Sequence, residues 1–359
     1  MSPLCGKFGY DEDIEKISGR LVEDETFNQP RQEMSFMKKV FILGGTGFLG
    51  YFTTKELLKR GYQVSTVSLP PMPAEDLLPK EVECTLGDIN AMTDEEILEM
   101  LKDVYGVVYA AGADERVVPD APAMKFFYEA NVRPTQRLAR LAKQAGVEKF
   151  VLYGSYFAHF AEKWTDLPIM QNPYPRTRLL QEEVACMEGE GGMDVTTIRL
   201  PYIFGVMPGR MPLWTMFVDR VKGKDFVPVL GGGTAMVTAQ QVAEATIGAM
   251  EHGEHRGKYA ICGINMKHSE FHQMVADALG QSETKIAVLP LEQIKPAMEQ
   301  MDAETAAAGK EHGIHMSVAA EVQDRDCYLD PADTMPILKY NEDDVLASIV
   351  ETLHKCVEG

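Results

Sequence analysis

The sequence predicts an α/β fold, with a doubly wound parallel sheet and a smaller C-terminal lobe. Short apolar runs alternate with helical patterns from about residue 39 to residue 200. The runs are mostly apolar rather than strictly alternating, which indicates strands buried on both faces, as in a parallel sheet covered by helices. A glycine-rich turn lies between the first run and the first helical pattern.

The strands are expected at the apolar runs, which lie at 40–43, 63–68, 82–86, 107–110, 150–153, 195–200 and 258–262. Helices are expected where apolar residues recur at helical spacing. The first helix ends near Arg60 because Gly61 follows, and the second begins at Thr93 and Glu96, which have capping-box spacing, and runs through Leu101. The other helices are expected at 123–145, 174–187, 271–279 and 343–355, and residues 303–313 are expected to form an exposed helix or excursion.

The charge and the cysteines exclude several classes of protein. The 359 residues include 35 lysines and arginines against 54 aspartates and glutamates, a formal net charge of -19. Such a surface repels nucleic-acid phosphates and anionic membranes, so we expect neither as a partner. The six cysteines are scattered, without disulfide or metal-binding spacing, which is typical of the reducing cytoplasm. We also expect no secretory signal, and no stretch reaches the roughly 20 apolar residues of a membrane span.

The turn after the first strand has the pattern of a dinucleotide-binding loop. Gly44, Gly47 and Gly50 are spaced G-x-x-G-x-x-G. The first glycine permits the tight turn, the second lets the backbone approach a pyrophosphate, and the third lets the helix pack close to the strand. The pyrophosphate then lies at the positive end of the helix dipole. The alternative is a glycine turn without a ligand, but the strand–turn–helix context favours NAD or NADP bound at Gly44, Thr46, Gly47, Phe48 and Leu49.

The residues after the second strand slightly favour NADP over NAD. Dinucleotide-binding folds often place an acid there to bind the ribose 2′-hydroxyl. Residues 64–70 contain neither an acid nor an arginine, and the small Ser68 leaves space for a 2′-phosphate. Asp88, just past the third strand, is placed to accept a hydrogen bond from the adenine amino group. The alternative is an ordinary turn or cap aspartate.

Several segments follow one another in the order seen in a known family. They are GGTGFLG (44–50), GDIN (87–90), AAG (110–112), Asn131-Val132, FVLYGS (150–155), YPRTR (174–178) and RLPYIFG (199–205). From about residue 39 to its end, the chain resembles the NAD-dependent epimerase/dehydratase family, the extended and atypical short-chain dehydrogenases/reductases. The resemblance implies a Rossmann-type fold, a homodimer through paired helices, a bracing role for Asn131, and cofactor contacts at Ile89, Ala110, Ala111, Gly112, Pro201 and Ile203.

The resemblance also implies a catalytic set, which becomes Ser155, Tyr174 and Arg178. Residues four positions apart share a helix face, so a cation at position 178 stabilises the phenolate of Tyr174 and reaches the cofactor ribose. The tyrosine exchanges a proton with a substrate hydroxyl while hydride moves to or from nicotinamide. Ser155 is expected to donate a hydrogen bond to the same substrate oxygen.

Arg178 is a departure from the family, which has lysine at this position. Arginine keeps the positive charge but is bulkier and spreads the charge over a planar fork. Three outcomes follow: a working variant site, which we favour because Ser155 and Tyr174 are retained, a slow site, or a site that binds cofactor without chemistry. An alternative interpretation makes Arg178 a surface residue that pairs with Glu182.

Aromatic and methionine side chains gather in the segments expected to line the substrate pocket. The expected substrate contacts are Tyr156, Met207, Met211 and Trp214, with Phe157, Tyr202, Leu213 and Phe217 nearby. This lining favours a flat or apolar substrate; the alternative is that these residues form the core of the lobe. Residues 230–236 contain no arginine to bind a nucleotide-sugar diphosphate. His268 and His272 have i, i+4 spacing without a third ligand nearby, so we expect no metal.

These observations predict an NAD(P)-dependent oxidoreductase that interconverts an alcohol and a ketone on a small apolar or aromatic molecule. The alternatives are an NAD-dependent sugar epimerase or dehydratase and, because of Arg178, an NAD(P)-binding protein without catalysis. Residues 37–205 are the expected Rossmann domain, and residues 206–359 a mixed substrate-binding lobe with late Rossmann elements. Residues 1–36 are expected to form an acidic extension, in which Ile14, Ile17 and Leu21 have the spacing of a short helix.

Overall fold

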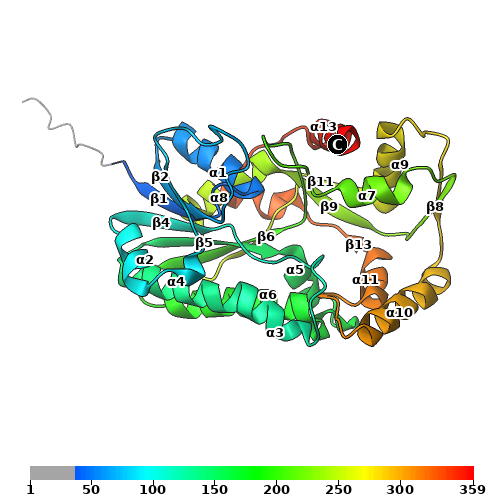
Figure 1. The fold of residues 1–359 in the computed structure, drawn as a ribbon, viewed down its shortest axis with the longest axis horizontal. Helices are drawn as coiled ribbons and strands as arrows, with labels where there is room; N and C mark the ends of the chain where they lie inside the picture. Colours follow the sequence, from blue (N-terminus) through cyan, green and yellow to red (C-terminus); the bar gives the residue numbers. More distant parts are fainter. Residues whose placement is uncertain (1–36) are drawn as a thin grey trace, which may run out of the picture. The chain divides into compact units, whose positions relative to one another are not determined.

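The computed structural model describes residues 37–359, so the acidic extension and its expected short helix lie outside the described residues. The main sheet has seven parallel strands in the order β10-β6-β5-β4-β1-β2-β3 (Figure 1). Its strands are β1 (Lys39–Leu43), β2 (Gln63–Ser68), β3 (Glu83–Leu86), β4 (Val104–Tyr109), β5 (Lys149–Ser155), β6 (Asp194–Leu200) and β10 (Lys258–Ala260). The order runs outward in both directions from β1 and β4, which confirms the predicted doubly wound fold.

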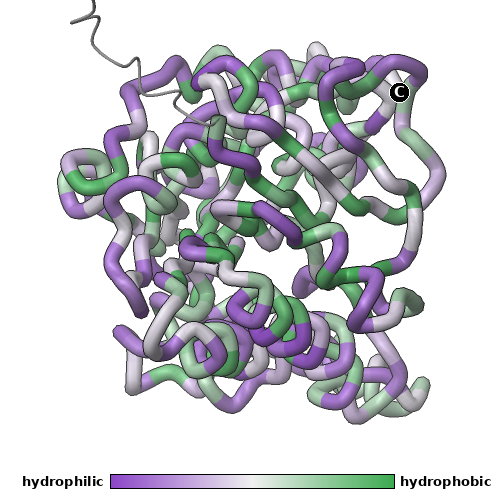
Figure 2. The backbone as a smooth tube through the Cα atoms, turned by 90° about the vertical axis from the view of Figure 1, so that its left-hand side faces the viewer, coloured by the Kyte–Doolittle hydropathy of each residue, from purple (hydrophilic) through white to green (hydrophobic). Residues whose placement is uncertain are grey.

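Both faces of the central strands are buried, which explains why β1 is apolar from Val40 to Leu43, whereas the edge strand β3 is largely exposed. In β1, Val40 and Ile42 pack into one core cluster, whereas Phe41 and Leu43 pack into another. The first cluster includes residues of α1 (Phe48–Lys59) and α8 (Ala239–His252). The second includes residues of α2 (Asp94–Met100), α4 (Arg133–Gln144) and α6 (Pro173–Gly189). In Figure 2 the inner segments are mostly hydrophobic and the hydrophilic ones lie mainly at the periphery.

The single helix expected at 123–145 is interrupted. It consists of α3 (Ala123–Phe127), one π-helical turn, η2 (Tyr128–Val132), and α4. Pro134, in the first turn of α4, has no amide hydrogen to donate to the preceding turn, so regular α-helical bonding cannot run through this point. The interruption lies at Asn131, whose side chain bonds both the N–H and the carbonyl of Ala113. Asn131 therefore braces the loop after β4.

A second, four-stranded sheet follows β6. It contains β11 (Ile264–Lys267), β9 (Gly233–Thr238) and β13 (Asp326–Cys327), and β7 (Tyr202–Phe204) also pairs with β9. A separate pair consists of β8 (Phe226–Val229) and β12 (Lys285–Val288). The helices packed with these strands are α7 (Thr215–Val221), α9 (His268–Ala278) and α13 (Val345–Glu358). Because α8 and β10 return to the main sheet, residues 206–359 contribute to both parts.

The remaining elements are short, apart from one long helix. They are η1 (Ile89–Ala91), α5 (Tyr156–Lys163), η3 (Pro168–Gln171), α10 (Leu291–Ala307), α11 (Met316–Gln323), η4 (Pro331–Asp333) and α12 (Met335–Leu338). Helix α10 begins before the excursion expected at 303–313 and contains Pro296. None of the helices within residues 37–359 combines the length and the apolar character required to cross a membrane.

Candidate active site

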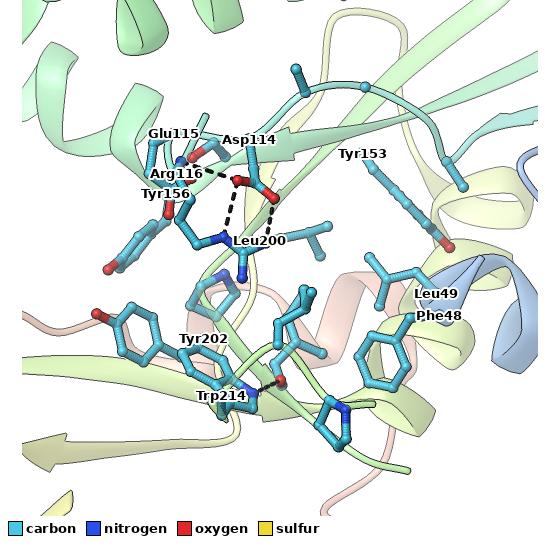
Figure 3. A pocket seen from close by; sticks show the side chains of 18 of the residues that line it. Phe48, Leu49, Asp114, Glu115, Arg116, Tyr153, Tyr156, Leu200, Tyr202 and Trp214 are labelled. Atoms are coloured by element: carbon cyan, nitrogen blue, oxygen red, sulfur yellow. Dashed lines mark hydrogen bonds and ion pairs between the residues drawn. The ribbon is translucent and has the colours of Figure 1, made fainter. Parts of the chain in front are cut away.

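A cavity of about 720 Å³ lies at the carboxyl ends of β4, β5 and β6 (Figure 3). This edge of a parallel sheet is where α/β folds usually bind ligands. Three segments supply most of the walls: residues 110–116 after β4, residues 153–157 at the end of β5, and residues 200–217 after β6. Most of the predicted site residues line the cavity, namely Phe48, Leu49, Ala110, Ala111, Gly112, Ser155, Tyr156, Tyr174, Arg178, Pro201, Ile203, Met207, Met211 and Trp214.

The glycine loop beside this cavity has the geometry of an anion cradle. Gly44 has φ +95°, and a Cβ there would lie 2.8 Å from the Ala110 carbonyl oxygen. A Cβ on Gly50 would lie 2.1 Å from the Gly44 carbonyl oxygen, so the helix could not pack as closely with any other residue. Helix α1 starts after Gly47, and no described side chain caps its first turn. The first amides of α1 are therefore free to bind a phosphate group.

Two hydroxyls of β2 brace the glycine loop. The Gly45 N–H donates to Thr66 Oγ1 at 2.9 Å, and the Thr46 N–H donates to Ser68 Oγ at 3.1 Å. Ser68 thus supports the loop in addition to leaving space beside it, and the role of Thr66 was not predicted. An alternation of hydroxyls on the strand next to the loop is the sequence signal for this brace.

Asp88 and Ile89 lie outside the cavity. Asp88 accepts a hydrogen bond from the Asn90 N–H at 2.9 Å and so caps η1, which is the ordinary turn role given above as its alternative. Ile89 is buried in the cluster on the α4 side of the sheet. Their contact with adenine stays a prediction.

Tyr174 lies in the first turn of α6, with its side chain buried at the cavity. Ser155 ends β5, and its hydroxyl accepts a hydrogen bond from the Phe157 N–H at 3.3 Å. Burial raises the pKa of Tyr174 to about 12, while the positive charge of Arg178 and a hydrogen bond from Ser155 act to lower this pKa. The phenol is therefore protonated near neutral pH and able to donate its proton.

Arg178 lies one turn further along α6, on the same face as Tyr174. Its Nη2 donates a hydrogen bond to the Tyr153 carbonyl, and its guanidinium carbon lies 5.7 Å from the centre of the Tyr174 ring. Its Nε is buried and has no hydrogen-bond partner within residues 37–359. The interpretation that Arg178 pairs with Glu182 at the surface is wrong, because Arg178 is buried and Glu182 pairs with Arg199.

Tyr153 also links α6, which carries Arg178, with the helices on the other face of the sheet. Its phenol oxygen lies 2.6 Å from Thr53 Oγ1 on α1 and 2.8 Å from Thr246 Oγ1 on α8. Its main chain contacts Arg178, and its side chain contacts the helix that follows the glycine loop.

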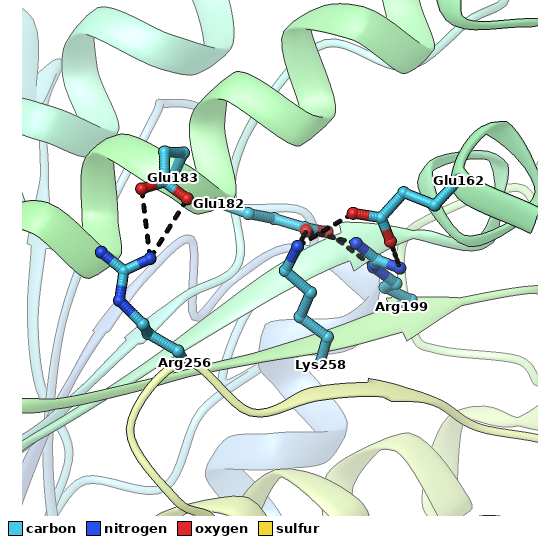
Figure 4. Close-up of polar contacts among 6 residues, drawn as sticks. All are labelled: Glu162, Glu182, Glu183, Arg199, Arg256 and Lys258. Carbon is cyan, nitrogen blue, oxygen red and sulfur yellow. Dashed lines mark hydrogen bonds and ion pairs between the residues drawn. The ribbon is translucent and has the colours of Figure 1, made fainter.

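Beyond Arg178, the same face of α6 is held by an ion network whose central pair, Glu182 and Arg199, is buried (Figure 4). Glu182 accepts hydrogen bonds from Arg199 Nη2 at 2.6 Å and from Arg199 Nε at 3.0 Å. Arg199 Nη1 also reaches Glu162 at 2.6 Å, and Lys258 donates to the other Glu162 oxygen at 2.9 Å. Because Arg199 belongs to β6, the face of α6 that carries Arg178 is fixed against both β5 and β6.

A charged wall of the cavity was not predicted as part of the site. Asp114, Glu115 and Arg116 line the cavity on the side opposite Tyr202 and Trp214 (Figure 3). Arg116 Nε donates to Asp114 Oδ1 at 3.0 Å, so these two charges neutralise each other. Burial, followed by the negative charge of Asp114, raises the pKa of Glu115. The sequence signal that could have indicated this wall is a run of three charged residues shortly after a buried strand.

The opposite wall is aromatic. The rings of Tyr202 and Trp214 lie 4.8 Å apart, and Trp214 Nε1 donates to the Ile203 carbonyl at 2.8 Å. Tyr156 lies 6.3 Å from Tyr202, and its phenol oxygen lies 3.2 Å from Thr234 Oγ1. These rings pack with the smaller lobe and also line the cavity, so packing in the lobe does not exclude a role in the pocket. Their contact with a substrate stays a prediction.

The histidine pair on α9 belongs to the packing of the smaller lobe. Burial lowers the pKa of His268 and of His272 to about 4, and His272 Nδ1 lies 2.7 Å from the His268 carbonyl oxygen. Across residues 37–359, no three histidine, cysteine, aspartate or glutamate side chains are arranged to hold a metal ion.

Comparison with known sequences links this geometry to one family. The NAD dependent epimerase/dehydratase family matches residues 40–262. Sterol-4-alpha-carboxylate 3-dehydrogenase, decarboxylating, of Homo sapiens is 28% identical over 210 residues, which cover 56% of this chain and 53% of the relative. UDP-glucose 4-epimerase of Neisseria meningitidis serogroup B is 26% identical over 264 residues, which cover 60% and 74%. The matches cover 53%, 63% and 61% of the human, mouse and cattle sterol dehydrogenases, so the chain matches only part of their length.

Solved structures share the fold over most of the chain. The crystal structure of gox2253 has a TM-score of 0.69 at 19% identity and covers 88% of this chain and 97% of its own. UDP-glucose 4-epimerase from Bifidobacterium longum, solved in complex with NAD+ and UDP, has a TM-score of 0.63 at 17% identity and covers 89% and 97%.

Proposed function

Because the chain belongs to the NAD dependent epimerase/dehydratase family, we propose that it is an NAD(P)-dependent oxidoreductase that interconverts an alcohol and a ketone. One observation carries the proposal: Ser155, Tyr174 and Arg178 line a single cavity beside a glycine loop whose helix amides are uncapped. The fold brings together residues that are separated in sequence and that this chemistry requires. If the glycine loop bound no ligand, the grouping of these three residues beside it would have no explanation.

The described residues fit a dinucleotide. The uncapped amides of Phe48 and Leu49 would bind the pyrophosphate, and the unpartnered Nε of Arg178 would reach the ribose. Pro201 and Ile203, further along the cavity, would lie against the nicotinamide ring. When bound, the nicotinamide supplies or accepts the hydride. The lack of an acid at residues 64–70 is the reason that we expect NADP to bind somewhat better than NAD.

Tyr174 provides the proton in this proposal. A phenol that stays protonated at neutral pH can donate to a carbonyl oxygen as that oxygen gains negative charge. Ser155 would donate a hydrogen bond to the same oxygen, which stabilises the charge in the transition state. In the reverse direction, Tyr174 must first lose its proton, and the positive charge of Arg178 favours that step.

The walls of the cavity define the class of substrate. The aromatic wall suits a flat apolar or aromatic skeleton, with Tyr156, Met207, Met211 and Trp214 in contact. The Glu115 carboxyl group on the opposite wall suits a polar substituent that can form a hydrogen bond with it. We therefore propose a small hydroxy or keto compound with an apolar body and one polar substituent. A cytoplasmic location and a homodimer remain part of the proposal, on the cysteine pattern and the family resemblance.

A second candidate function is that of a sugar epimerase or dehydratase. It is favoured by the sequence match to UDP-glucose 4-epimerase. It predicts that purified protein retains its cofactor and catalyses no net turnover of added NADH or NADPH. A third candidate, cofactor binding without catalysis, rests on Arg178 alone.

The test begins with the purified chain and each reduced cofactor. We expect quenching of protein fluorescence and a rise in Tm with NADPH, and a smaller effect with NADH. Reduction of a panel of apolar ketones should then consume the cofactor. If neither cofactor binds, the proposed function is wrong.

A further inference from the structure

A segment far along the chain contacts the first turn of α6, which carries Tyr174. Residues 309–315, which we name the clamp segment, connect α10 with α11. Two side chains of α10 hold the segment: Thr305 Oγ1 lies 3.0 Å from His312 Nε2, and Asp302 accepts a hydrogen bond from the Met316 N–H, just after the segment, at 2.7 Å. Its conformation therefore depends on α10.

The clamp segment bonds the first turn of α6. The Gly313 carbonyl accepts a hydrogen bond from the Tyr174 N–H at 2.8 Å, and Asn172 Oδ1 accepts one from the His315 N–H at 2.8 Å. Amides in the first turn of a helix have no partner within the helix and are usually satisfied by nearby side chains or water. Here the amide of the proposed proton donor is satisfied by main chain from a distant segment.

The clamp segment also fixes α3, whose Phe127 contacts Tyr174. Glu311 Oε2 accepts a hydrogen bond from the Ala123 N–H, the first residue of α3, at 2.7 Å. The Ala121 N–H donates to the Gly309 carbonyl at 2.9 Å. The Phe127 ring meets the Tyr174 ring edge to face, with centroids 5.5 Å apart. Helix α3, which packs on the Tyr174 ring, and the first turn of α6, which carries it, are thus both tied to one segment.

Gly313 leaves no space at this contact. A Cβ on Gly313 would lie 2.7 Å from Phe127 Cζ and 3.1 Å from Tyr174 Cβ. Since these distances are shorter than normal contacts, an alanine would push the two rings or the segment apart. The positive-φ glycine that ends α10, Gly309, is not crowded in this way.

We propose that Gly313 and Glu311 are positioning residues that fix the ring of Tyr174 in the cavity, so that α10 and α11 complete the active site. The inference rests on the proposed function, because it assigns a task to the tyrosine that we propose as proton donor. It predicts that disturbing the clamp segment changes the environment of the Tyr174 phenol without changing the glycine loop.

The experiment uses the full chain labelled with meta-fluorotyrosine and observed by fluorine NMR. The signal that Tyr174→Phe removes identifies Tyr174. In Gly313→Ala, we expect this signal to shift and its titration to move down by about one pH unit, because a displaced ring is closer to water and burial raises its pKa. NADPH affinity should stay within about twofold of wild type, a free-energy change well under that of one hydrogen bond.

The matched control for the added methyl group is Gly231→Ala, whose Cβ would lie 3.6 Å from its nearest neighbour. If Gly313→Ala does not fold, Glu311→Ala tests the same contact through α3, with Glu304→Ala of α10 as its control. An unchanged Tyr174 signal in the folded clamp variants would overturn the inference even if NADPH binds. A chain that binds no cofactor would instead overturn the proposed function. The NMR spectra would still show whether the clamp segment positions the Tyr174 ring, because they do not depend on bound cofactor.

Discussion

Glu182 and Arg199 form a doubly hydrogen-bonded ion pair in which both side chains are buried, at 1% and 3% exposure. The pair joins α6 to β6, and Glu182 lies one helical turn beyond Arg178. A charge in this environment is stabilised only by its partners, because water does not reach it. The pair is therefore a strong constraint on where α6 lies.

The first prediction concerns the removal of one partner of this pair. Glu182→Ala leaves Arg199 with Glu162 alone, and we expect a loss of about 3–5 kcal/mol in the free energy of unfolding. Glu183→Ala is the matched control, since Glu183 is exposed and pairs with Arg256 at the surface (Figure 4). Urea unfolding of both variants measures the difference. Equal stability of the two variants would show that the buried pair does not hold α6.

The second prediction concerns the proton donor. Tyr174→Phe should lower kcat for ketone reduction by roughly 10²–10⁴, the usual contribution of general acid catalysis, with NADPH affinity preserved. Tyr128→Phe is the control, because Tyr128 is partly exposed and lies outside the cavity. Full activity in Tyr174→Phe would mean that another group supplies the proton.

The third prediction is a difference between the two directions of reaction. With the pKa of Tyr174 raised to about 12, the protonated phenol needed for reduction dominates through neutral pH. The phenolate needed for alcohol oxidation becomes about tenfold more abundant with each unit of rising pH below that pKa. Reduction should therefore be flat near neutrality, and oxidation should rise steadily. Profiles of kcat/KM against pH in both directions test this, and a pH-independent oxidation rate would contradict it.

The fourth prediction concerns the glycine loop. Gly50→Ala places a Cβ 2.1 Å from the Gly44 carbonyl oxygen, so the loop must move away from α1. We expect NADPH to bind at least about tenfold more weakly, a loss of about 1.4 kcal/mol. Gly192→Ala is the control, with its Cβ in ordinary contact 3.8 Å from Lys143. Fluorescence titration gives both affinities, and equal values would remove the loop from the cofactor site.

The fifth prediction addresses Arg178. Arg178→Met removes the charge that lowers the pKa of Tyr174, so oxidation should slow further, and NADPH should bind roughly tenfold more weakly through loss of a charged hydrogen bond. Arg178→Lys keeps the charge and should recover part of the oxidation rate and part of the NADPH affinity. Arg176→Met, an exposed residue of the same helix, is the control. If Arg178→Met matches wild type in binding and rate, Arg178 has only a structural role.

The parts of the fold that local patterns determine could be predicted from the sequence. The apolar run of β1 sends Val40 and Phe41 to opposite cores, and that requirement is visible in the run itself. The roles of Gly44 and Gly50 could be predicted because they depend on the local turn between β1 and α1. The prediction of a single helix at 123–145 was wrong at η2, because a helical pattern of apolar residues does not reveal a π-helical turn just before Pro134.

The rest depended on contacts between distant parts of the chain. The clamp segment meets Tyr174 only after α10 and α11 have folded back, and no local pattern near either residue indicates this. Arg178 has Glu182 at helical spacing, but Arg199 from the next strand pairs with that glutamate instead. The wall formed by residues 114–116 could not be predicted without knowing that the aromatic wall lies opposite it. Such contacts between distant residues depend on the order of the strands in the sheet. That order cannot be deduced from any short stretch of sequence.

Tyr153 has a consequence for protein engineering. Its carbonyl accepts a hydrogen bond from Arg178 of α6, and its hydroxyl forms hydrogen bonds with Thr53 and Thr246 on the other face of the sheet. A chimera whose imported α1 has no hydroxyl at position 53 would lose one of these contacts with β5. Designers who exchange coenzyme preference by grafting should therefore transplant the two elements as one block.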